Sequence, residues 1–316
     1  MRILVTGVAG FIGSTLAERL VSDGHAVVGI DNFSDFYDRR LKESNLSHLS
    51  QAISFILVED DLNKADLRAL LDGVDVVYHL AGQPGVRKSW GNDFENYVDA
   101  NIIATQRLLE AIRSSAPSLT RFVYASSSSA YGNAERYPTR EADRPQPLSP
   151  YGVTKLAGEY LVSLYAANFG VPAISLRYFT VFGPRQRPDM AFNRFISQAL
   201  SGGALPVHGD GTQIREFTYV DDIVDANVSA GAASVQPGAV VNLSGGAAIS
   251  VNEVLDLLEK IHGAPLKVIR GRAALGDVLR TGGSTERAKE LLGWEPRVGI
   301  EAGLASEYDW LAAQHA

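Results

Sequence analysis

The stretch Thr6-Gly7-Val8-Ala9-Gly10-Phe11-Ile12-Gly13 carries three glycines at every third position, directly after the apolar run Ile3-Leu4-Val5. An amphipathic segment, residues 11–23, follows, so the glycines stand between a predicted strand and a predicted helix. Glycine lets the backbone approach a pyrophosphate closely, and the first N–H groups of a helix attract its charge. The spacing is GxxGxxG instead of the commoner GxGxxG. Its position nevertheless favours a dinucleotide cradle over a tight turn that binds nothing.

The rest of the first half alternates apolar runs with amphipathic segments. The predicted strands are residues 3–5, 26–30, 54–58, 74–80, 121–126 and 173–178. The predicted helices include residues 11–23, 94–114 and 150–169. Continuous apolar strands separated by helices indicate an α/β fold with a doubly wound parallel sheet of the Rossmann type, covered on both faces. Ligands of such sheets bind at the carboxyl ends of the strands.

The pattern changes after Phe179, where the segment 180–216 is rich in Gly, Pro and Arg and shows little periodicity. Helix and strand patterns return at 217–245, and short elements follow from residue 249. We therefore expect a dinucleotide-binding domain made of residues 1–180 plus 217–245. A smaller α/β domain that binds the substrate is expected from residues 181–216 plus 246–316.

The composition is ordinary for a globular protein, with 316 residues, 46% hydrophobic residues and a net charge of −7. No run of Lys and Arg indicates nucleic-acid binding. No apolar run approaches the roughly 20 residues of a membrane span. The chain has no cysteine, which excludes disulfides and thiolate metal sites and favours a reducing compartment. We expect a cytoplasmic protein without a nucleic-acid, membrane or metal partner.

Asp31 ends the second predicted strand, 24 residues after Gly7. A carboxylate at this point accepts hydrogen bonds from both ribose hydroxyls of an adenosine and repels a 2′-phosphate, which favours NAD over NADP. The alternative is an aspartate that only forms a turn before Asn32. Asp61-Leu62 follows the third strand as a candidate for the adenine edge, with a plain loop as the alternative.

Other strand ends complete the predicted cofactor site. The small residues of Leu80-Ala81-Gly82-Gln83 end the fourth strand and leave room for the cofactor. The full predicted set is Gly7, Gly10, Phe11, Ile12, Gly13, Asp31, Asn32, Asp61, Leu62, Leu80, Ala81, Gly82, Gln83, Asn101, Tyr151, Lys155 and Tyr178.

Asn101 lies on an apolar stripe, where a polar side chain needs a partner. That partner is either backbone or water near Lys155, or a purely structural group.

Tyr151 and Lys155 are the candidates for proton transfer. Ser149 and Pro150 predict the start of a helix, so Tyr151 and Lys155 share one face as an i, i+4 pair. A tyrosine needs a lowered pKa to act as a base near pH 7, and a neighbouring ammonium favours the phenolate. Ser127, in the run 126–129 after the fifth strand, is the candidate that relays the substrate's proton to Tyr151. A surface lysine and backbone-capping serines are the alternatives.

Together these residues resemble an extended short-chain dehydrogenase/reductase of the nucleotide-sugar epimerase/dehydratase group. The matching pieces are Thr6 to Gly13, Asp31, His79 to Gly82, Asn101, Ser126 to Gly132, Tyr151 to Lys155, Arg215 to Asp222 and Gly293 to Pro296. The resemblance implies bound NAD, catalysis by Ser127, Tyr151 and Lys155, and a nucleoside-diphosphate sugar under the second domain. It also implies a homodimer through the helices at 94–114 and 150–169.

The resemblance further implies that Arg215 pairs with a substrate phosphate and that Asp277 reaches the nucleoside ribose. Family members often carry an arginine three residues before that aspartate, where this chain has Ala274. Arg280 and Arg272 are the candidates to replace it.

Five further positions bear on the reaction. Dehydratases of this family place Asp-Glu where this chain has Ser128 and Ser129, so the resemblance is to 4-epimerases. Thr180 and Arg185, with Arg87 upstream, resemble UDP-glucuronate 4-epimerases. Arg185 is predicted to pair with the sugar carboxylate, with Thr180 and Ser128 as neutral donors; a diphosphate contact or a loop salt bridge is the alternative for Arg185. The expected reaction is inversion of C4 of UDP-glucuronate. The alternatives are a UDP-glucose or UDP-N-acetylglucosamine 4-epimerase, a net oxidoreductase, and a non-catalytic NAD-sensing protein.

Overall fold

A parallel sheet organises the first part of the chain. This computed structural model describes residues 1–272 and 278–315. Within them, the central sheet has the strand order β11-β6-β5-β4-β1-β2-β3, with every neighbouring pair parallel. Its strands are β1 (Arg2–Thr6), β2 (Ala26–Asp31), β3 (Phe55–Glu59), β4 (Val76–His79), β5 (Arg121–Ser127), β6 (Ala173–Tyr178) and β11 (Ala239–Leu243). The order reverses between β1 and β4, which is the switch point where such sheets bind ligands. The doubly wound α/β fold predicted from the sequence is confirmed.

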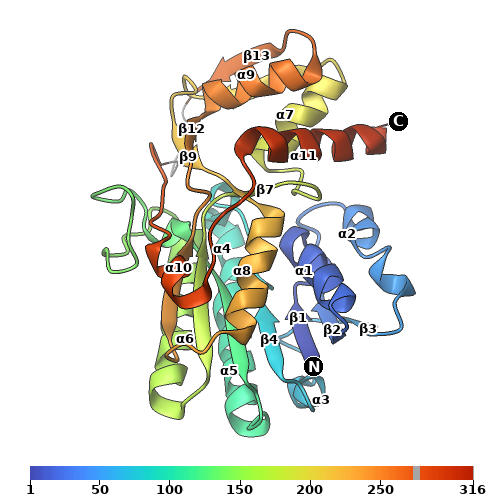
Figure 1. Ribbon diagram of the computed structural model, residues 1–316, viewed down its shortest axis with the longest axis vertical. Coiled ribbons are helices and arrows are strands. Elements are labelled where there is room, and N and C mark those ends of the chain that lie inside the picture. Colours follow the sequence, from blue (N-terminus) through green and yellow to red (C-terminus); the bar gives the residue numbers. More distant parts are fainter. Residues whose placement is uncertain (273–277, 316) are drawn as a thin grey trace.

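Helices cover both faces of this sheet (Figure 1). One face carries α1 (Phe11–Ser22) and α8 (Val220–Ala232), which pack against each other. The other carries α3 (Leu67–Leu71), α5 (Ala104–Ser115) and α6 (Pro150–Phe169), with α4 (Phe94–Val98) leading into α5. The short helix α2 (Arg39–Asn45) follows β2.

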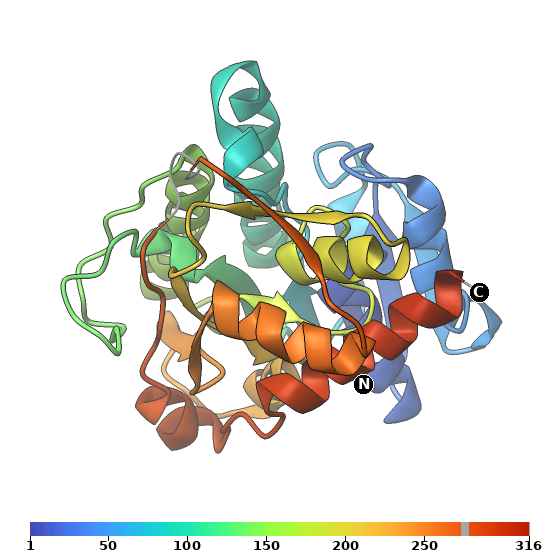
Figure 2. The same cartoon turned by 90° about the horizontal axis from the view of Figure 1, so that it is seen from above.

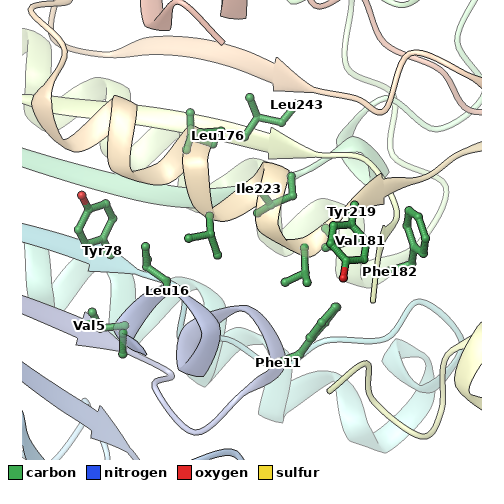
Figure 3. Close-up of a cluster of buried hydrophobic side chains, with 14 of the residues drawn as sticks. Val5, Phe11, Leu16, Tyr78, Leu176, Val181, Phe182, Tyr219, Ile223 and Leu243 are labelled. Carbon is green, nitrogen blue, oxygen red and sulfur yellow. The ribbon is translucent and has the colours of Figure 1, made fainter. Parts of the chain in front are cut away.

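Alternate residues of each strand feed two hydrophobic cores, as a sheet covered on both faces requires. Ile3 and Val5 of β1 face α1 and α8, whereas Leu4 faces α5 and α6. Figure 3 shows that the first core extends from Val5 and Leu16, at the left of the view, to Phe182 and Tyr219 at its right. The sheet and the elements above it therefore share one packed interior.

The remaining elements gather at the carboxyl end of the sheet (Figures 1 and 2). They are β7 (Val181–Phe182), α7 (Ala191–Leu200), β8 (Ala204–His208), β9 (Ile214–Glu216), β10 (Thr218–Tyr219), β12 (Ala248–Ser250), α9 (Val251–His262), β13 (Lys267–Gly271) and α11 (Ile300–His315). Two-stranded pairs join them: β7 with β10, β8 with β13, and β9 with β12. The predicted two-domain boundaries stay a prediction, and α10 (Glu286–Leu292) packs on β11 and α8 although the sequence assigned it to the second domain.

The predicted helix at 94–114 is the one that differs most from expectation. A π-helical turn at Asp99–Ile103 separates α4 from α5. Such turns recur at functional sites, and this one places Asn101 toward α6 through a hydrogen bond to Thr154 Oγ1 (2.9 Å). By contrast, the predicted helix 150–169 and strand 173–178 have the predicted ends. No helix in the described residues is long and apolar enough to cross a membrane.

A buried ion pair joins α6 to the sheet. Arg177 of β6 donates to Glu159 of α6 through Nε (2.9 Å), and their side chains are 4% and 2% exposed. The Ser126 hydroxyl donates to the same carboxylate (2.7 Å). Glu159 lies one turn beyond Lys155, so this pair fixes the helix that carries the candidate catalytic residues.

Removing one partner of this pair is expected to destabilise the fold strongly. In Glu159→Ala, Arg177 keeps a buried charge without its counterion, which costs about 3–5 kcal/mol in unfolding free energy. Urea denaturation measures this. The matched control, Lys289→Ala, breaks the exposed pair with Glu295 and should cost less than about 1 kcal/mol. Equal losses in the two variants would contradict this role of Glu159.

Candidate active site

A cavity of about 690 Å³ lies along the carboxyl ends of the central strands. Of the predicted cofactor residues, all but Asn101 line it: Gly7, Gly10, Phe11, Ile12, Gly13, Asp31, Asn32, Asp61, Leu62, Leu80, Ala81, Gly82, Gln83, Tyr151, Lys155 and Tyr178. Its size is that of a ligand pocket. The structure thus brings together residues that are up to 171 positions apart in the sequence.

The glycine stretch forms a tight strand-to-helix turn at one end of this cavity. Gly7 has φ +69°, and a Cβ on it would come within 2.8 Å of the backbone of Ala81. A Cβ on Gly13 would lie 2.2 Å from the Gly7 carbonyl oxygen. Only glycine fits at both positions, and the first turn of α1 therefore opens toward the cavity with its N–H groups. This geometry fits the pyrophosphate of a dinucleotide.

Asp31 lies at the end of β2, on the wall of the same cavity. Its carboxylate accepts hydrogen bonds from Ala9 N–H (3.0 Å) and Phe33 N–H (2.8 Å). These bonds hold the carboxylate beside the glycine turn, where the adenosine ribose of a dinucleotide would lie. Asn32 donates to Asp61 (3.0 Å), which joins the ends of β2 and β3.

Tyr151 and Lys155 face the cavity from the first turns of α6. Ser149 caps this helix by accepting from Gly152 N–H (3.1 Å). Burial lowers the pKa of Lys155 to about 8, so its side chain is still mostly an ammonium at neutral pH. Its Nζ lies 5.2 Å from the centre of the Tyr124 ring.

Burial has the largest effect on the pKa of Tyr151. The sequence predicts that Lys155, together with the positive charge of oxidised nicotinamide, lowers this pKa; among the groups of the protein itself, burial raises it above its ordinary value. The groups that oppose this rise are the Ser127 hydroxyl and the guanidinium of Arg187. Desolvation of the phenolate outweighs them, which the sequence could not reveal because it depends on how deeply α6 packs.

Asn101 is held by backbone as well as by α6. Its Oδ1 accepts from Gln83 N–H (2.7 Å), and its Nδ2 donates to the Gln83 carbonyl (3.1 Å) and to Thr154 Oγ1. The amide thus joins the end of β4, which lines the cavity, to the residue before Lys155. This is the backbone-holding alternative of the two that the sequence left open, and a direct role in cofactor binding stays a prediction.

The buried His79 lies beneath this assembly. Thr105 Oγ1 donates to the Asn101 carbonyl (2.8 Å), so it must accept from His79 Nε2–H (3.0 Å). His79 Nδ1 then accepts from Thr6 Oγ1 (2.8 Å), which itself accepts from Ala81 N–H (3.0 Å). Burial and the nearby Lys155 lower the pKa of His79 to about 3. The imidazole is therefore neutral, and one continuous chain of hydrogen bonds connects β1, β4 and the π-helical turn.

The structure places Arg185 away from the cavity, contrary to its predicted contact with a sugar carboxylate. Its guanidinium donates to both carboxylate oxygens of Glu18 on α1 (2.8 and 2.9 Å) and to Ser14 Oγ (3.3 Å). This is the loop salt bridge that the sequence left as the alternative. Arg187, two residues later, lines the cavity instead and affects the pKa of Tyr151.

The other predicted substrate residues lie outside the set that lines the cavity. Ser128 and Thr180 are half-buried at the ends of β5 and β6. Arg87 is exposed, whereas the next residue, Lys88, lines the cavity. Arg215 donates to the Ile214 and Val278 carbonyls (2.8 and 2.5 Å). These roles stay predictions.

Asp277 and Ala274 fall outside the described residues. Arg280 stacks on Tyr137, with its guanidinium carbon 4.9 Å from the ring centre, and Arg272 is exposed.

Several residues of the cavity wall were not predicted from the sequence. Phe36 and Tyr37, in the loop after β2, line it together with Lys88, Tyr97 and Arg187. Lys88 Nζ and the Arg187 guanidinium lie 4.7 and 5.8 Å from the centre of the Phe36 ring. The available signal was the pair of aromatic residues in a polar loop directly after the predicted ribose-binding Asp31.

The fold and this site define a dinucleotide-dependent α/β enzyme with a Tyr/Lys pair. Residues 3–244 match the sequence pattern of the NAD dependent epimerase/dehydratase family. The chain belongs to this family, as its sequence resemblance predicts, and NAD is the cofactor that the cavity fits.

Similar proteins cover the whole chain. "Uncharacterized UDP-glucose epimerase YtcB" of Bacillus subtilis strain 168 is 45% identical over 99% of this chain and 98% of its own length. A UDP-glucuronate 4-epimerase of Thermodesulfobacterium geofontis is 38% identical over 97% and 95%. The solved UDP-glucuronic acid 4-epimerase of Bacillus cereus, in complex with UDP-glucuronic acid and NAD, has a TM-score of 0.96 and 44% identity, with full coverage of both chains.

The glycine turn predicts a sharp effect on cofactor binding. In Gly13→Ala the new methyl group collides with the Gly7 carbonyl, so the turn must open. We expect the affinity for NAD to fall by at least about tenfold, or about 1.4 kcal/mol, as measured by calorimetric titration. Gly299→Ala is the control, because its Cβ would meet no atom within 4 Å. Unchanged affinity in Gly13→Ala would contradict the cradle assignment.

Proposed function

We propose that this protein inverts C4 of a UDP-sugar and that its main reaction converts UDP-glucuronate to UDP-galacturonate. One observation carries the choice of substrate: Arg187, a cationic group, lines the cavity beside Tyr151. A uronate carries a carboxylate that a guanidinium binds through charge-assisted hydrogen bonds. Relatives named UDP-glucuronate 4-epimerases support the same choice.

The proton chemistry falls to Tyr151. Its phenolate takes the proton of the sugar 4-OH, directly or through Ser127, and returns a proton to the inverted oxygen at the end of the turnover. Bound NAD would supply the acceptor, and later the donor, of the C4 hydride, which side chains of the protein do not provide. Lys155, which lines the same cavity, holds positive charge near the phenolate in this proposal and is our candidate to bind the nicotinamide ribose. Between the two half-reactions the 4-keto sugar turns to present its other face.

The protein must also protect the carboxylate of the sugar during the reaction. The 4-keto form of a uronate is a β-keto acid, which tends to lose carbon dioxide. Arg187, with Thr180 and Ser128 as neutral donors, would hold the carboxylate and stabilise its charge against this loss.

Dehydration is disfavoured, because Ser128 and Ser129 occupy the positions where dehydratases of this family carry an acid and a base.

We further propose a homodimer through α4, α5 and α6, as predicted. Large apolar side chains are exposed on α6, namely Val153 (47%), Tyr160 (54%), Leu164 (56%) and Phe169 (55%), and on the π-helical turn before α5, namely Ile103 (42%). Large exposed apolar side chains gathered on neighbouring helices support an interaction site. The absence of cysteine supports the cytoplasm as the location.

A neutral UDP-hexose is the second candidate substrate. The relative from Bacillus subtilis carries the name of a UDP-glucose epimerase. Arg187 also pairs with Asp189 (2.9 Å), which partly compensates its charge. Incubation of the purified protein with each sugar decides: turnover of UDP-glucose or UDP-N-acetylglucosamine without turnover of UDP-glucuronate would overturn the proposal.

Two arginine variants test how the carboxylate is recognised. Arg187→Leu should lower kcat/KM for UDP-glucuronate about 10- to 100-fold, since a hydrogen bond to a charged group is worth about 1.5–3 kcal/mol. Turnover of UDP-glucose should change less. Arg185→Leu breaks the pair with Glu18 and should affect both sugars alike. If only the Arg185→Leu variant loses its preference for UDP-glucuronate over UDP-glucose, Arg185 binds the sugar carboxylate, as the sequence predicts. The assignment of Arg187 is then wrong.

The base is tested by Tyr151→Phe. The variant keeps the ring but cannot accept a proton, so kcat should fall about 10²- to 10⁴-fold while calorimetry shows NAD still bound. Stopped assays that follow UDP-galacturonate formation measure this. A variant that keeps most of its activity would exclude Tyr151 as the base.

A further inference from the structure

Glu307 is a buried carboxyl group that the reaction described above does not use. It lies in the middle of α11, and its side chain is 0% exposed. Its Oε2 accepts a hydrogen bond from Gly183 N–H (2.7 Å), 124 positions earlier in the chain. Its Oε1 has no hydrogen-bond partner among the described residues. A carboxyl group in such a place is costly, so the contact with Gly183 calls for an explanation.

The surroundings leave α11 little freedom to shift against this contact. Gly303, one turn before Glu307, approaches β7 and β10 so closely that a Cβ would lie 2.6 Å from Phe182 and 2.7 Å from Tyr219. Gly183 has φ +130°, and a Cβ there would lie 2.9 Å from Val220. Figure 3 shows Phe182 and Tyr219 side by side at the right of the cluster, with their ring centres 5.5 Å apart. The backbone of α11 at Gly303 and that of the turn at Gly183 therefore both pack directly against side chains of the core, with no room for a side chain of their own.

Gly183 belongs to the segment that carries the proposed substrate residues. The Thr180 carbonyl accepts from Thr218 N–H (2.9 Å) at the start of this segment. Gln186 N–H donates to the Gly183 carbonyl (3.0 Å), and its side chain donates to the Val181 carbonyl (3.1 Å). The turn is thus one hydrogen-bonded unit between Thr180 and Arg187. Glu307 fixes the Gly183 amide of that unit from the core side.

We propose that Glu307 is a positioning residue for the substrate: by holding the Gly183 amide, it sets where Thr180 and Arg187 meet the sugar carboxylate. The inference rests on the proposed function, because it assigns Arg187 to that carboxylate. Glu307 itself touches neither substrate nor cofactor. The C-terminal helix thereby contributes to substrate choice from behind the turn.

The ionisation of Glu307 gives this contact a pH signature. Burial raises the pKa of Glu307 to about 8, opposed only by the Gly183 N–H. The titratable group that interacts with Glu307 is the Tyr219 phenol of β10. Asp221 and Asp222 of α8 also raise the pKa of this phenol. An unfolded glutamate titrates near 4.3. The folded protein therefore holds this proton more tightly, and its stability falls as the pH rises from about 4.5 to 8.

Two substitutions separate the hydrogen bond from the charge. Glu307→Gln keeps an acceptor for Gly183 and cannot ionise. We expect near-normal KM and kcat for UDP-glucuronate, and a Tm gain over the natural protein that is larger at pH 8 than at pH 5.5. Glu307→Met keeps the length of the side chain without the acceptor. We expect its KM for UDP-glucuronate to rise about tenfold, with a smaller change for UDP-glucose.

The outcomes distinguish the possible failures. If Glu307→Met lowers Tm but leaves the ratio of kcat/KM between the two sugars unchanged, Glu307 is only structural and the inference is wrong. The inference is also wrong if Glu307→Gln loses selectivity between the two sugars, because the amide keeps the acceptor for Gly183. This second test does not need Glu307→Met and can be used even if that variant fails to fold. Glu301→Leu, at an exposed position of the same helix, is the control. If the natural protein does not turn over UDP-glucuronate, the proposed function fails first.

Discussion

The hydrogen bonds through His79 join the three parts of the molecule that must keep a fixed distance. Thr6 ends the strand before the glycine turn, and Ala81 follows the neighbouring strand. Asn101 lies in the π-helical turn and donates to Thr154 of α6, the helix that carries Tyr151 and Lys155. The Gly7 backbone approaches Ala81 so closely that no side chain fits between them. Only a neutral imidazole with its proton on Nε2 satisfies both threonines. The pyrophosphate cradle and the proton-transfer pair are therefore parts of one rigid unit, which suits a reaction in which cofactor and substrate must stay aligned through two half-reactions.

Much of the fold could be predicted from the sequence because parallel strands buried on both faces are continuous apolar runs. The segment 173–178 is such a run, and the helix 150–169 has local signals at both ends, from Ser149 and Pro150 to Gly170. The π-helical turn at Asp99–Ile103 had no such signal. It exists because Asn101 finds partners on Gln83 and Thr154, which are distant in the sequence and adjacent only in the folded protein.

The site divides in the same way. The residues along the cofactor wall follow strand ends, so the order of the strands alone places them at one edge of the sheet. The two arginines at 185 and 187 could not be separated from the sequence, because both belong to one irregular turn. A left-handed residue at Arg185 (φ +71°) and the acceptor Glu18 on α1 decide that Arg185 points away and Arg187 lines the cavity. The raised pKa of Tyr151 likewise depends on packing depth. Glu307 gave no sequence signal at all, since nothing in the neighbouring sequence marks this glutamate as buried.

The central claim is that the hydrogen at C4 of the sugar leaves and returns within one bound complex. The most direct measurement uses UDP-glucuronate labelled with deuterium at C4, incubated with the protein in ordinary water, with the product examined by NMR. The account predicts UDP-galacturonate with its deuterium fully retained at C4. Loss of the label to solvent, or inversion at another carbon, would contradict it.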